Sequence, residues 1–355
     1  YQNLSEKNDS WCPLPWAQVA VHNSGEYRSC IQARTCKKTK GILKDDNNNI
    51  MRADTHSIDD VRNAPLLKDV RKSMLDGERH SMCVRCNDED DAKMASRRRN
   101  AIREYYNKYN YDYWKAESST MPDGTLVIDK APVLEWDIRL GNLCNIKCRM
   151  CHPSESTQWY NEWFDTMFQG FKTDFTRVEL LKDKNKVKLK NDIYQWNDIP
   201  YFFDQFDGSA SGTKKIYFSG GEPTLVENMY TMLQKLIDAG IRCDTNLIIE
   251  TGSARNPHHY AVLIGYGATA IYPYLAYEIL NEMVVKNKIS QNKYGDCVKN
   301  YIQGINKGLL KIMSKMGISC ISSYRGAQLF EIVGLDQKIV ELCFKDTISR
   351  ISGSD

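Results

Sequence analysis

The stretch of sequence that decides the fold reads Leu140-Gly141-Asn142-Leu143-Cys144-Asn145-Ile146-Lys147-Cys148-Arg149-Met150-Cys151. Its three cysteines, Cys144, Cys148 and Cys151, have the spacing C-x3-C-x2-C. Three thiolates on one short loop can hold three irons of a [4Fe–4S] cluster, and the fourth iron is then open to another ligand. The apolar run at residues 133–140 is typical of a strand that delivers this loop.

A second strand with its own turn follows later in the chain. Residues 215–219 form a short apolar run, which is followed directly by Gly220-Gly221-Glu222-Pro223. Residues 227–239 then have the apolar spacing of an amphipathic helix, and an aromatic helix is expected at residues 156–170. The polar residues 171–214 between them suggest one or two short helices on the surface. Strand, helix, strand and helix in this order predict the opening of a parallel barrel.

Four cysteines near the start of the chain form a second group. Cys12 precedes a predicted hairpin and Cys30 ends it, so the turn at residues 23–26 brings the two together. Cys83 and Cys86 have the C-x2-C spacing of a metal-binding knuckle. Two such pairs can bind a zinc ion, which the spacing slightly favours, or an iron–sulfur cluster. Buried free cysteines without a metal are the structural alternative.

These motifs resemble those of radical S-adenosylmethionine (SAM) proteins. The resemblance implies a [4Fe–4S] cluster whose open iron binds SAM, and reductive cleavage to a 5′-deoxyadenosyl radical that modifies a peptide or another macromolecule. An electron donor such as a flavodoxin or ferredoxin is implied as well. The first cysteine group resembles the twitch or SPASM auxiliary module, which implies a second iron–sulfur cluster. The implied site residues are the metal ligands Cys12, Cys30, Cys83, Cys86, Cys144, Cys148 and Cys151 and the SAM-binding residues Gly220, Gly221, Glu222 and Pro223.

The last third of the chain resembles a different family. The runs at residues 247–255, 258–268, 306–319 and 323–331 are similar to the central domain of the glutamate synthase large subunit. This resemblance implies a non-catalytic segment of an oxidoreductase that assimilates ammonia. FMN is implied only for the complete protein. From the pattern alone, helices are expected near residues 268–285 and 298–316, and His258-His259 is more typical of packing than of a metal site.

Composition places limits on partners and compartment. The net charge is +3, with 26% charged and 42% hydrophobic residues, so the charge balance gives no case for nucleic acid or an anionic membrane. The uncharged residues 260–277 contain Gly265, Gly267 and Pro273, which favours a buried strand, turn and helix over a membrane span. Seven of the twelve cysteines have ligand-like spacing, which predicts a reducing cytoplasm. Tyr1 in place of Met suggests that the start is missing.

The predicted fold class is α/β. A small α+β cysteine-rich module at residues 1–110 precedes a partial radical SAM (β/α) barrel at residues 132–246. An α/β segment of the glutamate synthase central type follows at residues 247–355. The main hypothesis for function is a radical SAM enzyme in a chimeric and incomplete chain. The alternative is a structural fragment of glutamate synthase.

Overall fold

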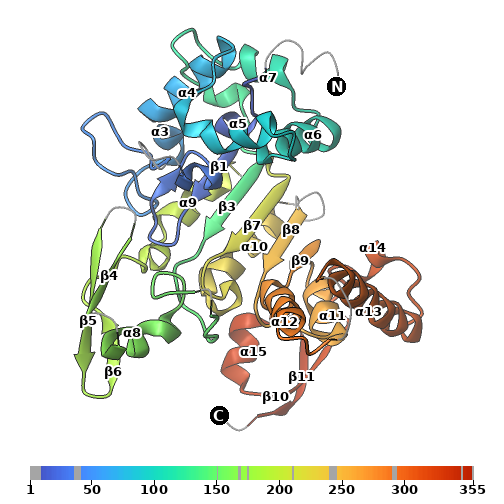
Figure 1. Cartoon of the computed structure of the whole chain (residues 1–355). Helices are drawn as coiled ribbons and strands as arrows, with labels where there is room; N and C mark the ends of the chain where they lie inside the picture. Colours follow the sequence, from blue (N-terminus) through green and yellow to red (C-terminus); the bar gives the residue numbers. More distant parts are fainter. Residues whose placement is uncertain are drawn as a thin grey trace.

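The computed structural model describes most of the chain (Figure 1). The described residues are 9–35, 41–149, 151–166, 169–173, 176–209, 212–239, 246–289, 294–344 and 347–353. A six-stranded sheet runs through the middle of the molecule. Helices from the first third of the chain lie at one end of it, and those from the last third lie at the other (Figure 1).

The first third consists of short strands and helices, and most of these helices pack around an aromatic-rich core of their own. Serine and aspartate side chains begin three of the helices: Ser57 and Ser96 accept hydrogen bonds from the first turns of α3 and α6, and Asp112 does so for α7. α6 ends where Asn110 adopts a left-handed conformation with φ of 51°. The elements are α2 (Leu14–Ala17), β1 (Gln18–Val21), β2 (Tyr27–Arg28), α3 (Ile58–Arg62), α4 (Pro65–Leu75), α5 (Val84–Asp91), α6 (Arg97–Tyr109) and α7 (Tyr113–Ser118).

The central sheet has the strand order β2-β1-β3-β7-β8-β9. β1, β3 (Glu135–Arg139), β7 (Lys215–Ser219), β8 (Asn246–Glu250) and β9 (Ala270–Tyr272) are parallel, and β2 is antiparallel to β1. This bears out a mixed α/β fold with a parallel sheet. The expected radical SAM barrel is not seen, because over the described residues the sheet stays open between its edge strands β2 and β9.

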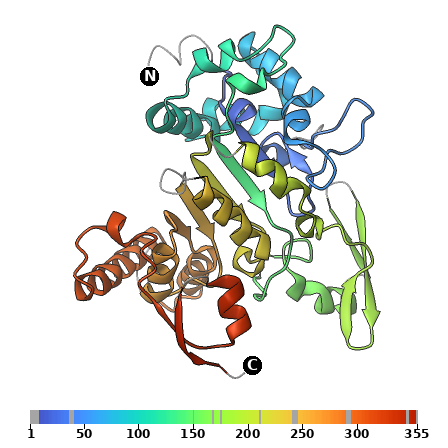
Figure 2. The same cartoon turned by 180° about the vertical axis from the view of Figure 1, so that it is seen from behind.

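Alternation along the strands gives the sheet two different faces. In β3, Trp136 and Ile138 are fully buried among the aromatic residues of α9 (Tyr201–Ser209), while Glu135 and Asp137 point to the other face. α9 and α10 (Glu227–Asp238) cover the apolar face (Figure 2). The core beneath them runs from Val19 in β1 to Ile249 in β8 and Ala268 before β9. A single core therefore extends across residues 246 and 247, where the sequence suggests a boundary.

Residues 171–214 contain an expected short helix, α9, and also strands that the sequence did not predict. A three-stranded antiparallel sheet forms from β4 (Gly170–Lys172), β5 (Arg177–Asp183) and β6 (Lys186–Leu189). Val178 and Leu180 of β5 are buried while their neighbours are exposed, which is the period of two that defines a half-buried strand. The expected helix at 156–170 is shorter and spans α8 (Tyr160–Thr166) after a 3-10 turn at Thr157–Trp159.

The last third is mainly helical. Its elements are α11 (Pro257–Gly265), α12 (Tyr274–Val285), α13 (Tyr294–Lys315), α14 (Ile321–Tyr324), β10 (Glu331–Leu335), α15 (Gln337–Cys343) and β11 (Ile348–Ser352). The helix expected from residue 268 begins at Tyr274 instead, because residues 270–272 pair with β8. β10 and β11 form a separate two-stranded parallel sheet. Among the helices that the structure describes, none has the length and hydropathy needed to cross a bilayer.

Candidate functional site

The carboxyl ends of four parallel strands bring most of the predicted site residues together. His22 follows β1, Gly141 follows β3, Gly220 follows β7 and Thr251 follows β8. In open α/β sheets, ligands bind at this edge because the loops there converge and the helices leave them free. The cysteine triplet and the Gly-Gly-Glu-Pro turn both lie here.

The Gly220–Pro223 turn is fixed against the cysteine loop. The backbone N–H of Glu222 donates to the carbonyl oxygen of Leu143 at 2.8 Å, and the Thr251 hydroxyl donates to the Glu222 carboxylate at 2.9 Å. Gly221 has φ of +49°, and a Cβ at this position would clash with the Leu143 carbonyl. Glycine is therefore needed for the close approach of the two loops. Pro223 begins a 3-10 turn.

Within the cysteine triplet, the pKa values of Cys148 and Cys151 shift in opposite directions. Cys144 and Cys148 are buried, and Cys151 is partly exposed. The hydrogen bond from the Cys151 thiol lowers the pKa of Cys148 to about 6, against the opposing effect of burial, and the Tyr274 hydroxyl assists at 3.4 Å. The same bond to Cys148 raises the pKa of Cys151. The loop therefore favours the thiolate form at Cys148 over Cys151.

The four cysteines of the first third surround one cavity. Cys12 lies before α2, Cys30 follows β2, and Cys83 and Cys86 lie at the start of α5. All four line a cavity of about 30 Å³. Burial raises the pKa of the Cys12 thiol, and negative charge on the other three cysteines would raise it further. The expected proximity of Cys12 and Cys30 thus extends to Cys83 and Cys86.

Metal binding by these cysteines stays a prediction. Within the described ranges, no group of three or more His, Cys, Asp or Glu side chains is arranged so that it could hold a metal ion. The cavity at the first group and the contact between Cys148 and Tyr274 at the second show which side chains lie together. They do not identify a bound group.

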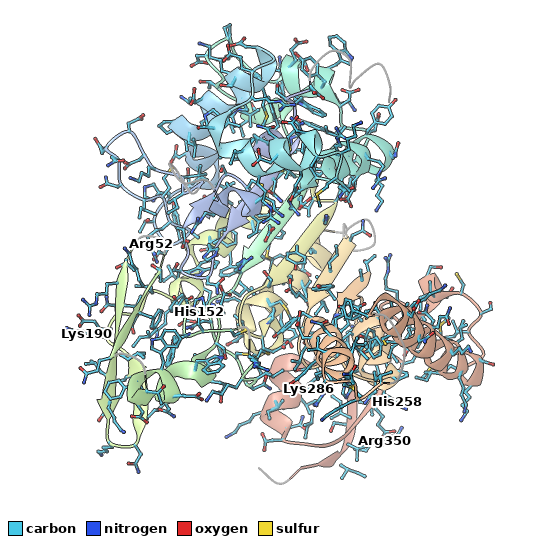
Figure 3. All side chains as sticks on the ribbon, in the orientation of Figure 1. Arg52, His152, Lys190, His258, Lys286 and Arg350 are labelled. Atoms are coloured by element: carbon cyan, nitrogen blue, oxygen red, sulfur yellow. The ribbon has the colours of Figure 1, made fainter. Side chains whose placement is uncertain are left out.

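A further set of polar residues at the same edge was missed by the sequence reasoning. A cavity of about 290 Å³ lies beside the end of β1, and its lining includes His22, Asn23 and Glu26. His152 closes it from the cysteine loop, between the sheet and β4 (Figure 3). The available signal was a run of polar residues directly after a buried strand, which in a parallel sheet marks the ligand-binding edge.

The last third contributes packing contacts. His258 and His259 lie in the first turn of α11, where both of their backbone N–H groups donate to Asn256. Arg325 donates to the Thr269 hydroxyl at 3.2 Å. The backbone N–H of Gly326 donates to the Ile264 carbonyl and so ties this turn to α11. Each of these contacts is accounted for by the packing of the segment.

Comparison with known proteins identifies this last segment. Residues 228–336 match the family model of the glutamate synthase central domain. The NADH glutamate synthase of Saccharomyces cerevisiae is 50% identical over 119 residues, which are 32% of this chain and 6% of the yeast protein. The large chain of the NADPH enzyme of Bacillus subtilis is 44% identical over 122 residues, 34% of this chain and 8% of the relative. A ferredoxin-dependent glutamate synthase of Arabidopsis thaliana is 44% identical over 129 residues, again 34% of this chain and 8% of the relative.

These findings correct the main hypothesis for function. The radical SAM enzyme, with its [4Fe–4S] and SPASM assignments, is wrong, because the family model and these relatives point to glutamate synthase and nothing in them or in the described residues shows a radical SAM module. SAM and a peptide substrate are likewise unsupported. The open sheet agrees with this correction. The chain spans under a tenth of the length of these relatives, and within it residues 228–336 match the glutamate synthase central domain.

Proposed function

We propose that the last third of the chain is a structural segment of a glutamate synthase, which docks onto the remaining parts of that enzyme. One observation carries this proposal. Most of the large hydrophobic side chains that are exposed among the described residues lie after residue 246. They include Val285, Leu310, Leu329, Val333, Ile348 and Ile351. Contiguous exposed apolar surface marks places where another protein surface packs.

The small β10–β11 sheet provides the clearest docking face. Val333 of β10 pairs with Ile351 of β11, so both side chains lie on one face of the sheet, and they are 65% and 59% exposed. A sheet of two strands is marginally stable in water unless something packs on it. A neighbouring surface that covers Val333 and Ile351 would supply that packing.

The activity itself belongs, on this proposal, to the complete enzyme. This chain spans 6 to 8% of the three relatives, whose names give NADH, NADPH or ferredoxin as the electron source. We therefore assign to the segment the joining of other domains, and we assign reductant, FMN and ammonia chemistry to the parts around it. A ferredoxin-type donor would act on those parts.

The docking proposal is tested by measuring whether the chain binds the other parts of a glutamate synthase. The regions of the Bacillus subtilis large chain that precede and follow its central domain are expressed and titrated against the whole chain by biolayer interferometry. We expect saturable binding, and at least a tenfold loss of affinity with Val333→Lys, because a lysine at the centre of an apolar contact must be desolvated. Met121→Lys is the matched control, since Met121 is 50% exposed in the first third.

Two results would overturn the docking role. One is a lack of association with either region. The other is an equal loss of affinity in Val333→Lys and Met121→Lys, which would show that the added charge acts non-specifically. Circular dichroism of both variants should match the unsubstituted chain, because both positions are exposed.

A second function is supported by the four-cysteine cavity. We propose that Cys12, Cys30, Cys83 and Cys86 bind a metal centre as thiolates, and that Cys144, Cys148 and Cys151 form a second thiolate site. Arg97 and Arg98 also line the first cavity, and their positive charge would offset the negative charge of several thiolates. A zinc ion is the metal that four such thiolates would bind. Such a centre would cross-link the first third, because its ligands come from three separate segments.

Metal analysis distinguishes a zinc ion from an iron–sulfur cluster. The whole chain is purified without oxygen, and its iron, zinc and acid-labile sulfide are measured. Iron with sulfide would identify a cluster, and zinc alone would identify a single ion. We expect the double variant Cys83→Ser/Cys86→Ser to lose the first centre and Cys144→Ser/Cys148→Ser the second, while Cys320→Ser, which changes an exposed cysteine, loses neither. Absence of both metals from the purified chain would refute the proposal.

A further inference from the structure

Tyrosine side chains gather beside β9, the strand at one edge of the central sheet (Figure 1). The ring centroid of Tyr277 in α12 lies 5.6 Å from that of Tyr272 in β9 and 6.1 Å from that of Tyr301 in α13. Burial raises the pKa of Tyr277, and Tyr294, the first residue of α13, is one of the neighbours that raise it further, so it belongs to the same group. We call these four residues the tyrosine surface.

The tyrosine surface is open to solvent at two of its members. Tyr272 is 49% exposed and Tyr294 is 40% exposed. A tyrosine ring offers an apolar body with a polar tip, which is why tyrosines are enriched where proteins meet. Exposed tyrosines that lie in one connected group therefore mark an interaction surface.

Two carboxylates lie beside the tyrosine surface. Glu250 of β8 pairs in register with Tyr272, so the two side chains lie on one face of the sheet. Burial raises the pKa of Tyr272, and negative charge on Glu250 and on Glu278 of α12 raises it further. Both glutamates are partly exposed, and neither forms a hydrogen bond or an ion pair within the part of the chain that the structure describes. Their charges are therefore available to a partner.

The other carboxylates of this face already have counter-ions. Asp137 lies 3.8 Å from Arg97. Glu155 lies 3.8 Å from Arg139. Burial raises the pKa of Glu250, and Arg139 lowers it, while Asp137 and Glu155 raise it again. A cation bound beside Glu250 would favour its ionised form, whereas a negatively charged partner would be repelled.

Aromatic rings next to unpaired carboxylates select a flat cation. A guanidinium group stacks on a tyrosine ring through a cation–π interaction, and it pairs with a carboxylate through two parallel hydrogen bonds. We propose that the tyrosine surface binds an arginine side chain from a basic segment of a partner protein, with Glu250 and Glu278 supplying the negative charge. This inference goes beyond the docking role of β10 and β11 and does not depend on it, because it uses other elements and a charged contact.

Isothermal titration calorimetry on the whole chain tests the proposal. The probe is a short peptide with blocked ends that carries two arginines between glycines, and it is compared with peptides that have lysine, citrulline or glutamate at the same places. We expect saturable binding of the arginine peptide at millimolar concentration or below. The citrulline peptide should bind about fivefold more weakly, because citrulline keeps the shape of arginine without its charge. The lysine peptide should also bind more weakly, since an ammonium group cannot form the paired hydrogen bonds, and the glutamate peptide should not bind.

Two substitutions separate the contribution of the ring from that of the charge. Tyr272→Leu removes the aromatic ring but keeps an apolar side chain, and it should weaken binding of the arginine peptide about two- to fivefold. Glu250→Gln removes a charge at nearly equal volume, and it should weaken binding about threefold and reduce its dependence on salt. Tyr106→Leu is the matched control, because Tyr106 is a tyrosine of α6 that is 40% exposed in the first third.

Several results would overturn the proposal. They are a lack of saturable binding by the arginine peptide, equally tight binding by the citrulline or lysine peptide, and an equal loss of affinity in Tyr106→Leu and Tyr272→Leu. Circular dichroism spectra of Tyr272→Leu and Glu250→Gln should match that of the unsubstituted chain, because neither side chain is fully buried.

Discussion

Two identical substitutions on α13 should change stability in opposite directions. Gly304 and Gly308 lie one turn apart on this helix, within the segment that matches the central domain. A Cβ at Gly304 would meet nothing within 4 Å. A Cβ at Gly308 would lie 2.5 Å from Cβ of Pro257, the first residue of α11. The proline ring is rigid, so the two helices would have to separate.

The magnitudes follow from two opposing effects. Alanine in place of glycine stabilises a helix interior by about 1 kcal/mol, and Gly304→Ala should gain this amount. Gly308→Ala gains the same amount but also overpacks the α11–α13 contact, which costs about 1–3 kcal/mol. The two variants should therefore differ by about 1–3 kcal/mol in the free energy of unfolding, with Gly304→Ala the more stable.

Thermal and urea unfolding of the whole chain measure this difference. About 2–4 °C per kcal/mol is expected for a cooperative unit of 150–250 residues, so Gly304→Ala should melt several degrees above Gly308→Ala. The urea m-value should be equal in both, because the surface exposed on unfolding is unchanged. Equal stabilisation by the two substitutions would refute the close approach of α11 and α13.

Three more perturbations test the strand ends and the helix caps. The pKa of Glu26 is about 2, because charge and hydrogen bonds from His22 and Arg28 outweigh the burial that would raise it. The ionised carboxylate should therefore stabilise the fold by about 3 kcal/mol above pH ~4.5, and this contribution should be lost as the pH falls towards 2. Glu26→Gln should flatten the pH dependence of the urea midpoint in that window. Asn256→Ala should cost about 1 kcal/mol, since it removes the acceptor for two backbone N–H groups at the start of α11, whereas Asn256→Asp should keep the melting temperature. Gly221→Ala should lower the melting temperature more than Gly77→Ala: both glycines have positive φ, but only at Gly221 would the added Cβ meet backbone.

Local patterns predicted the strands and helices at the centre of the fold. The strand at residues 215–219 and the helix that begins at residue 227 form as expected, because each has a clear apolar period that needs no distant partner. β5 was missed although Val178 and Leu180 are buried between exposed neighbours, because the many lysines around it resemble a surface loop. The open sheet could not be foreseen, since closure depends on which strands meet at its edges.

For the candidate sites, too, some features could be predicted from the sequence and others could not. Cys12, Cys30, Cys83 and Cys86, which the spacing suggested as ligands, all line one cavity, and their role as metal ligands stays a prediction. Spacing does not determine the chemistry, however, because short thiolate motifs serve many cofactors. The motifs that extend over the last hundred residues were the more reliable guide to family, as the match at residues 228–336 shows. The polar cavity beside β1 was not foreseen, because its walls include residues that are more than a hundred positions apart.

The pairing of β7 with β8 has a consequence for synthesis of the chain. β7 ends at Ser219 and its neighbour β8 begins at Asn246, beyond the start of the family match. On the ribosome, the β7 edge is therefore complete before its partner strand has emerged. Unpaired parallel edges are aggregation-prone while they wait. A nascent chain stalled before residue 250 should therefore recruit chaperones, and one released after β9 has been made should not.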